Sequence, residues 1–329
     1  MKAILIDPET KSLDWKDVPE PSVKDDDVLI KIHAAALNRA DLLQRKGAYP
    51  SPAGWPEWMG LEVAGTVEAL GKNAENKRFR IGDRVCALLG GGGYAEYVSV
   101  PQGMVMPIPK GLSFVEASAL PEAYATSYLN LFIEGHLQAG QTVFIPGGMG
   151  GLSSVSIPMA KAFGARVITS VRSTDSVEKI RHLGADVIID TTKEDVSEVL
   201  HREADAGHPV NLCMDCLGGE TMGKCFPYLA EGAYWVQIST LAGVETTIPL
   251  RAVLTKGLHL VGSMLRKRSY EEKSNILSAI TENVFPKIES GEMRPSIYKV
   301  LPIEKAAEAH DILERGENAG KVVLSVIHD

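Results

Sequence analysis

The sequence predicts an α/β protein in which a doubly wound parallel sheet is inserted into a smaller β-rich domain. Two observations predict the sheet: a glycine-rich turn within residues 143–165, and an alternation of strands and helices that continues to about residue 265. A third predicts the other domain, because short strands lie close together before residue 122. At 329 residues the chain is long enough for two domains.

The glycine-rich turn lies between an apolar run at residues 143–145 and a segment of helical period that begins at Leu152. Its four glycines are Gly147, Gly148, Gly150 and Gly151. A turn without side chains lets a pyrophosphate approach the free N–H groups at the start of a helix. The pattern alone is incomplete, since Ser153 replaces the third glycine of the dinucleotide fingerprint, and a glycine-rich loop without a ligand would look similar.

The segments that follow favour the dinucleotide-binding interpretation. Further strands are expected at residues 166–170, 186–190, 210–216, 233–238 and 258–262. Helix-length segments separate them, and the helix at residues 177–183 is followed by Gly184 as a C-cap. This alternation is typical of a parallel doubly wound sheet, which binds its ligand at the carboxyl ends of its strands.

The flanking segments form the second domain. Strands are expected at residues 2–6, 27–34, 64–69, 84–88 and 94–98, and they suggest a small β-rich barrel with residues 90–93 as a flexible connection beside the site. After residue 265 we expect a helix at 269–289, a strand at 297–302, a helix at 303–314 and a strand at 320–327. These do not continue the alternation. The expected domains are therefore 1–122 plus 268–329, and 123–267.

Composition indicates a soluble globular chain. Hydrophobic residues make up 45% and charged residues 23%, and no apolar run is long enough to span a membrane. A net charge of −8 argues against a basic nucleic-acid-binding face. The start of the chain lacks a secretory leader and the four cysteines suit a reducing compartment, so we expect a cytoplasmic protein. The Cys213-x-x-Cys216 spacing falls in an expected buried strand and is interpreted as structural rather than as a metal site.

Six motifs together resemble the zinc-lacking quinone oxidoreductase branch of the medium-chain dehydrogenase/reductase superfamily. They are NRADLLQRKGAYP at residues 38–50, GLEVAGTV at 60–67, IGDRV at 81–85, GGGGYAEYV at 90–98, LPEAYATSY at 120–128 and AGKVVL at 319–324. The resemblance covers the whole chain. It implies a Rossmann domain inserted into a GroES-like catalytic domain, NADPH as the hydride donor, and a homodimer joined through the Rossmann sheets.

The resemblance also bears on metal content. Zinc-dependent members place a catalytic Cys where this chain has Asn38, and a His where it has Leu61. They also insert four cysteines for structural zinc, whereas here Leu89 is followed directly by glycines. The remaining candidates, chiefly Asp41 and Glu62, cannot supply the three or four ligands that zinc needs. The resemblance therefore implies a zinc-free site.

Residue by residue, the family motifs imply a candidate active site. Tyr49, Asn38 and Asp41 match the active-site lip, and Thr126 matches a threonine beside the nicotinamide. The Tyr49 hydroxyl could donate a hydrogen bond to a developing oxyanion, or the ring could simply pack in a Pro-flanked loop. Asn38 and Asp41 are expected to brace the cleft, with direct proton transfer as the alternative. The expected cofactor-binding residues are Thr126, Gly147, Gly148, Met149, Gly150, Gly151, Leu152, Arg172, Ser173, Cys216, Gly218, Ser239 and Lys321.

Two departures from the family pattern concern the cofactor. Pro158 lies inside the expected phosphate-binding helix and should kink it. No acidic residue follows the second strand before Asp175; instead Arg172 could pair with a 2′-phosphate, with Ser173 and Thr174 as hydroxyl donors. The family's lysine and tyrosine for that phosphate fall at Ser176 and Thr191. Arg172 is thus expected to select NADPH, unless it is only a solvated surface arginine.

We expect an oxidoreductase that passes hydride from NADPH to a quinone or an α,β-unsaturated carbonyl compound. Such acceptors are already electrophilic, so they need no metal. One alternative is a 2-enoyl thioester reductase, for which Lys267 and Arg268 could offer a basic patch for a carrier phosphate. Another is a noncatalytic NADPH-binding role, since relatives serve as lens proteins or bind nucleic acid; the acidic composition weighs against nucleic acid.

Overall fold

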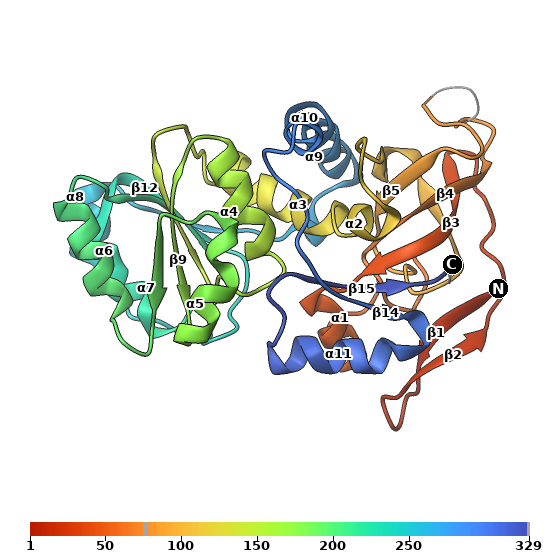
Figure 1. Cartoon of the computed structure of the whole chain (residues 1–329), viewed down its shortest axis with the longest axis horizontal. Helices are drawn as coiled ribbons and strands as arrows, with labels where there is room; N and C mark the ends of the chain where they lie inside the picture. Colours follow the sequence, from red (N-terminus) through yellow and green to blue (C-terminus); the bar gives the residue numbers. More distant parts are fainter. Residues whose placement is uncertain (75–77, 328–329) are drawn as a thin grey trace. The chain divides into compact units, whose positions relative to one another are not determined.

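The computed structural model describes residues 1–74 and 78–327, and these form two compact units. Unit 1 comprises Met1–Ala125 and the described part of Arg268–Asp329, and unit 2 comprises Thr126–Lys267. In Figure 1, unit 1 contains the red to yellow and the dark blue segments, and unit 2 the green and cyan ones. The sequence placed the two boundaries at residues 122/123 and 267/268; residues 328–329 of its catalytic domain lie outside the described part.

Unit 2 contains a parallel sheet with the strand order β10-β9-β8-β11-β12-β13. Its strands are β8 (Thr142–Pro146), β9 (Arg166–Val171), β10 (Val187–Asp190), β11 (Val210–Asp215), β12 (Leu229–Gln237) and β13 (His259–Gly262). Numbered within the unit, this order is 3-2-1-4-5-6, that of a dinucleotide-binding doubly wound sheet. The predicted fold of this domain is confirmed.

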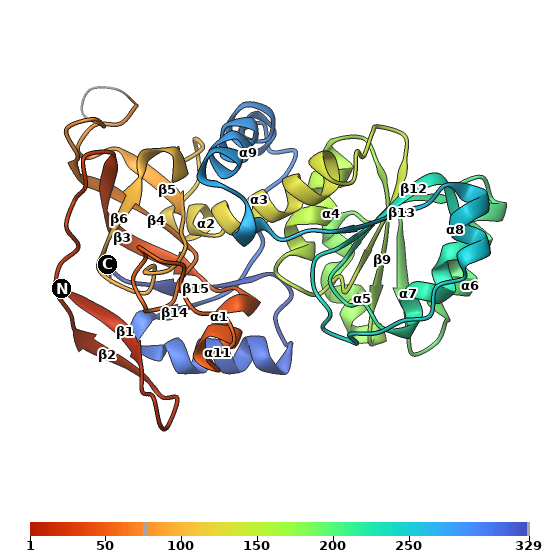
Figure 2. The ribbon, with the colours of Figure 1, turned by 180° about the vertical axis from the view of Figure 1, so that it is seen from behind.

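Helices cover both faces of this sheet. They are α4 (Ser153–Ala162), α5 (Thr174–Ile180), α6 (Val196–Asp205), α7 (Glu220–Cys225) and α8 (Leu250–Lys256). Phe144 and Trp235 pack with Leu200 of α6 and Met222 of α7 in one buried cluster, whereas α4 and α5 lie on the opposite side of the sheet (Figures 1 and 2). Burial of these apolar side chains, at about 25 cal/mol per Å², is what holds the layers together.

Unit 1 is built on a sheet with the order β14-β15-β3-β4-β5-β7, with β6 also paired to β3. Its strands are β3 (Asp27–Ala36), β4 (Glu62–Leu70), β5 (Arg84–Leu88), β6 (Tyr97–Pro101), β7 (Val105–Pro107), β14 (Ile297–Pro302) and β15 (Lys321–Ser325), and β1 (Lys2–Ile6) pairs separately with β2 (Leu13–Asp17). Because β15 lies antiparallel to β3, the end of the chain returns to the sheet of the first strands. This is the expected insertion into a β-rich domain.

The helices of unit 1 show where the sequence reading was wrong. They are α1 (Arg39–Arg45), α2 (Phe114–Ser118), most of α3 (Pro121–Tyr128), α9 (Tyr270–Asn283), α10 (Phe285–Glu289) and α11 (Ala306–Arg315). The single helix expected at 269–289 is interrupted at Val284, because Pro286 cannot donate a backbone hydrogen bond. The strand expected at 94–98 is β6, shifted to Tyr97–Pro101, while Tyr94 is fully buried before it.

Pro158 lies within α4, and the helix nevertheless extends from Ser153 to Ala162 without a break. Proline there removes one backbone donor, but residues on both sides of Pro158 are buried and keep the helix in place. Across residues 1–74 and 78–327, none of the helices has the length and apolar character needed to cross a membrane.

Candidate active site and dinucleotide-binding edge

The predicted cofactor residues of unit 2 meet at the carboxyl ends of its strands, which we call the dinucleotide-binding edge. Gly147 and Gly148 follow β8, Arg172 follows β9, Cys216 follows β11, and Ser239 follows β12. Since all four strands are parallel, these ends lie on one side of the sheet. The β8–β11 pair is where the chain order reverses, and ligands of open α/β sheets bind at such points.

The glycine turn after β8 leaves the backbone accessible. Gly147 has a φ of +78°, a conformation that favours glycine. A Cβ on Gly148 would come within 2.6 Å of the Ile180 side chain and 2.7 Å of Thr169 Oγ1, so a side chain there would displace the packing. A Cβ on Gly150 would meet only Gly147 O, at 3.6 Å. The turn therefore packs tightly on the sheet side and stays open around Gly150.

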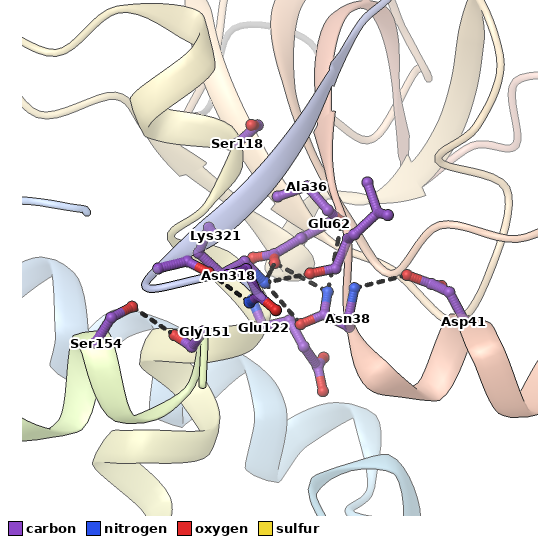
Figure 3. Close-up of polar contacts among 12 residues, drawn as sticks. Ala36, Asn38, Asp41, Glu62, Ser118, Glu122, Gly151, Ser154, Asn318 and Lys321 are labelled. Carbon is purple, nitrogen blue, oxygen red and sulfur yellow. Dashed lines mark hydrogen bonds and ion pairs between the residues drawn. The ribbon is translucent and has the colours of Figure 1, made fainter. Parts of the chain in front are cut away.

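The start of α4 fits an anionic group. Its N-cap residue is Leu152, which makes no side-chain cap hydrogen bond. The N–H groups of Ser154 and Val155 donate to Gly150 O and Leu152 O, so the N–H groups that precede them are the candidates for binding an anion. Ser153 Oγ donates to Gly147 O at 2.9 Å, and Ser154 Oγ donates to Gly151 O at 2.8 Å, as Figure 3 shows for the second pair. Ser153 therefore ties the turn to the helix instead of blocking it, and the segment fits a pyrophosphate.

At the end of β11 a buried carboxylate holds the adjoining turn. Asp215 Oδ1 accepts hydrogen bonds from the N–H groups of Leu217 at 2.7 Å and Gly218 at 3.1 Å, and Oδ2 accepts from Trp235 Nε1 at 3.1 Å. Burial raises the pKa of Asp215, and these hydrogen bonds oppose that shift. Gly218 has a φ of +63°, which suits the turn. No role was predicted for Asp215, although an acid at the end of an apolar strand is visible in the sequence.

At the end of β9 the structure corrects one prediction. Thr174 Oγ1 donates to Asp190 Oδ2 at 2.7 Å, so its single hydroxyl proton is not available to a phosphate. Ser173 is the N-cap of α5: its Oγ accepts from the Ser176 N–H and bonds to Ser176 Oγ at 2.8 Å. Arg172 is exposed beside them.

Asp190 supplies the carboxylate that the sequence did not show near this end. It ends β10, and its backbone pairs with Val171 in the neighbouring strand. Hydrogen bonds from Thr192 and Thr174 lower the pKa of Asp190 to about 2. Asp190 belongs to the strand that follows β9 in the chain, and it lies next to Thr174 only because β10 pairs with β9.

In unit 1, polar groups around the buried Glu62 and Lys321 form a connected cluster that we call the buried network: Leu37 O, the half-buried Asn38, Glu62, Glu122 N and Lys321 (Figure 3). Lys321 Nζ donates to Glu62 Oε1 at 2.7 Å, to Asn38 Oδ1 at 2.8 Å and to Leu37 O at 2.7 Å. The side chains of the ion pair are 3% and 0% exposed. An ammonium has three protons, and all three have acceptors here.

Asn38 and Lys321 already use the polar atoms of their side chains in hydrogen bonds of the buried network. Asn38 Nδ2 donates to Glu62 Oε1 at 2.9 Å while its Oδ1 accepts from Lys321, so both ends of the amide are engaged. This arrangement fits the bracing role expected for Asn38. Lys321 was expected among the cofactor contacts, but a hydrogen bond from its ammonium to a cofactor would require one of the three network bonds to break.

Asp41 lies fully buried next to the network. Its Oδ2 accepts from the Asn38 N–H at 2.8 Å, which caps α1, and from Tyr94 OH at 3.1 Å. Burial raises the pKa of Asp41 to about 6. Tyr94 OH also lies 3.4 Å from Nε2 of His310, whose pKa burial lowers to about 3. Tyr49 is half-buried in the loop after α1, and its substrate role stays a prediction.

Glu122 is a residue that the sequence reading missed. It lies in the first turn of α3, and its backbone N–H donates to Glu62 Oε2 at 2.9 Å. Burial and the Glu62 charge raise the pKa of Glu122 to about 8, although the residue is partly exposed. Thr126 follows one helical turn later, and its carbonyl accepts from Asn130 Nδ2 at 2.7 Å. The feature of the sequence that could have indicated Glu122 is an acidic residue within the otherwise uncharged family motif LPEAYATSY.

Within the described ranges, no group of three or more His, Cys, Asp and Glu side chains could hold a metal ion.

Two family models match the chain. The alcohol dehydrogenase GroES-like domain matches residues 24–110, and the zinc-binding dehydrogenase model matches residues 183–324.

Relatives and solved structures match nearly the whole chain. A quinone oxidoreductase-like protein 2 homolog from Nematostella vectensis is 30% identical, over 91% of this chain and 81% of that protein. A 2-methylene-furan-3-one reductase from Solanum lycopersicum is 34% identical, over 94% and 74%. Among structures, an NAD-dependent alcohol dehydrogenase is 29% identical with a TM-score of 0.83, over 99% and 100%. A mycobacterial protein complexed with NADPH is 25% identical with a TM-score of 0.85, also over 99% and 100%.

Proposed function

Because the chain belongs to the zinc-lacking quinone oxidoreductase branch of the medium-chain dehydrogenase/reductase superfamily, we propose that it is an NADPH-dependent reductase of quinones or α,β-unsaturated carbonyl compounds. The observation that carries this proposal is the dinucleotide-binding edge, where an open glycine turn meets a helix start without a side-chain cap. A quinone oxidoreductase-like relative and a 2-methylene-furan-3-one reductase relative support the acceptor classes.

The chain's own residues have distinct roles in this proposal. The segment from Gly147 to Leu152 binds the pyrophosphate through the backbone N–H groups next to the start of α4, because those of Gly148 and Gly150 already donate to Ser170 O and Gly147 O. Thr126 lies beside the nicotinamide. A bound nicotinamide supplies a hydride. Tyr49 donates a hydrogen bond to the oxygen on which negative charge develops. Asn38 and Asp41 hold the start of α1 in place through Glu62 and Tyr94.

We propose that the reaction needs no zinc. Asn38 and Leu61 stand where zinc-dependent members place Cys and His, and the Asn38 amide is already engaged by Lys321 and Glu62. Conjugated acceptors take hydride without a Lewis acid, because the resulting enolate or hydroquinone anion is stabilised by a hydrogen bond. One tightly held zinc per chain that is lost together with activity would contradict this part of the proposal.

We propose that Arg172 selects NADPH over NADH. Its guanidinium is exposed directly after β9, where the adenine ribose is read in this fold. Arg172→Ala should weaken NADPH binding by about 1.5 to 3 kcal/mol, the range for a hydrogen bond to a charged group, and leave NADH binding unchanged. Titration of both cofactors measures this, with Arg181→Ala as a control for another exposed arginine of unit 2. Equal losses for both cofactors would show that Arg172 does not read the phosphate.

The test of the function is turnover of NADPH with a panel of quinones, enones and 2-enoyl thioesters. Reduction of quinones or enones is expected. Faster reduction of a carrier-linked 2-enoyl thioester would favour the alternative in which Lys267 and Arg268 contact a carrier phosphate. NADPH binding without turnover of any acceptor would indicate a noncatalytic protein.

We also propose a cytoplasmic homodimer formed through β13. This strand is at one edge of the sheet, and an unpaired edge can pair with a second copy. Large apolar side chains are exposed on and near it: Leu260 is 53%, Leu250 is 76% and Leu254 is 83% exposed. The cytoplasmic assignment is supported by the free thiols of Cys86, Cys213, Cys216 and Cys225.

A further inference from the structure

Glu122 combines a fixed backbone with a side chain outside the buried network. Its N–H is held by Glu62 Oε2 at 2.9 Å, and Glu62 is held by Lys321 and Asn38. In Figure 3 the Glu122 carboxyl extends away from these contacts, and no interaction line drawn there reaches it. The network therefore fixes where the first turn of α3 lies, whereas the Glu122 carboxyl is outside the network and lies within the electrostatic influence of Lys273.

Reduction of a conjugated carbonyl compound requires a proton as well as a hydride. After hydride adds to the β-carbon, the C=C electron pair moves toward the carbonyl and leaves an enolate. The enolate becomes the saturated product when its α-carbon accepts a proton. Asn38, one of the predicted active-site residues, bonds to the same Glu62 that holds the Glu122 backbone, so Glu122 adjoins the part of the candidate site that unit 1 supplies.

We propose that Glu122 is the proton donor for this step, an inference that rests on the proposed reductase function. The O–H bond of the Glu122 carboxyl breaks, its proton forms the new C–H bond at the α-carbon, and the Glu122 carboxylate remains. No further oxidant or reductant is needed. Because Glu122 is partly exposed, water can return the proton before the next turnover.

The charges around Glu122 keep it protonated at neutral pH. Burial and the carboxylates of Glu62 and Asp41 raise its pKa, whereas Lys321 and Lys273 lower it, and the balance is a pKa of about 8. An acid whose pKa lies near the working pH is the most effective donor. Asp41 does not compete for the role, since it is fully buried and bonded to Tyr94 and Asn38.

The experiment compares wild type, Glu122→Gln and Glu122→Asp with NADPH and an enone across pH 6 to 9.5. Wild-type kcat should fall as pH rises through about 8. Glu122→Gln should lose about 10²- to 10⁴-fold in kcat, the usual contribution of an acid catalyst, and should lack this pH limb. Glu122→Asp keeps an acid and should retain the limb with a smaller loss. Glu271→Gln, an exposed acid in the first turn of α9, is the matched control and should behave as wild type.

NADPH affinity and thermal unfolding of each variant separate a catalytic role from a structural one. Both should match wild type in Glu122→Gln, because the backbone N–H that bonds to Glu62 is retained. An unchanged kcat with the same pH limb in Glu122→Gln would overturn the proposal and leave the reductase function intact. A Glu122→Asp loss as large as that of Glu122→Gln would also overturn it. Failure of wild type to turn over any acceptor would overturn both proposals.

Discussion

Lys321 and Glu62 form a buried ion pair whose removal should have a large effect on stability. Their Nζ–Oε1 distance is 2.7 Å, and the side chains are 3% and 0% exposed. Lys321→Met keeps the apolar stem and removes the charge, which leaves a carboxylate buried without its cation. Breaking one side of a buried pair costs about 3 to 5 kcal/mol. The carbonyl of Leu37 also loses its 2.7 Å contact with Lys321, so the upper half of this range is expected.

The free energy of unfolding is measured from urea denaturation followed by tryptophan fluorescence. Three tryptophans, Trp15, Trp55 and Trp58, belong to unit 1, so the signal reports mainly on the unit that contains the pair. Glu62→Gln should show a loss of similar size. The double variant Lys321→Met, Glu62→Gln has no unpaired charge and should be about 3 kcal/mol more stable than the sum of the single losses predicts.

A surface pair provides the control for this cycle. Lys299 and Glu308 lie 3.0 Å apart in the same unit, but their side chains are 44% and 45% exposed. Removing Lys299 should therefore cost less than about 1 kcal/mol. The reasoning would be refuted if Lys321→Met lowered the free energy of unfolding by no more than removal of Lys299 does. It would also be refuted if the losses of Lys321→Met and Glu62→Gln simply added in the double variant.

Three other results are expected. Tyr49→Phe should lower kcat by up to about 3 kcal/mol of transition-state stabilisation without weakening NADPH binding, and an unchanged kcat for every substrate would count against its role. Leu254→Glu should convert the proposed dimer to a monomer in light scattering; a wild type that is already monomeric at micromolar concentration would rule the dimer out. Because Asp41 has its pKa raised from 3.8 to about 6, its contribution to stability is full below pH 4 and lost as pH rises through 6. In Asp41→Asn the free energy of unfolding should no longer fall by about 3 kcal/mol between pH 4 and pH 6. If wild type and Asp41→Asn showed the same pH dependence in unfolding experiments, the assignment to Asp41 would be wrong.

The sheet of unit 2 was predictable because its evidence is local. Each strand is a short apolar run, and each glycine of the turn after β8 lies within a few residues of the others. The close packing at Gly148 explains the absence of a side chain there. Boundaries were less accurate: β12 begins at Leu229 and not at residue 233, because pairing of Leu229 with Val210 of β11 extends a strand that composition alone does not mark.

Polar contacts between distant segments could not be predicted. Lys321 and Glu62 are 259 residues apart, and the sequence shows only a charged residue in each of two apolar motifs. Their meeting depends on β15 and β4 both pairing with β3. Asp190 was missed for the same reason, since it reaches Thr174 from the neighbouring strand. Such contacts follow from strand order and register, which the sequence reading did not specify residue by residue.

The balance of buried charge connects these observations. Around Glu62 the structure brings two further acids, Asp41 and Glu122, but Lys321 is the cation that bonds directly to the group. One ammonium compensates one carboxylate, so a charge on the half-buried Glu122 would lie beside the carboxylates of Glu62 and Asp41 and would be costly. Holding Glu122 as the neutral acid satisfies this balance. The network that holds Asn38 and the Lys321–Glu62 ion pair therefore has at its edge an acid whose pKa is raised to about 8.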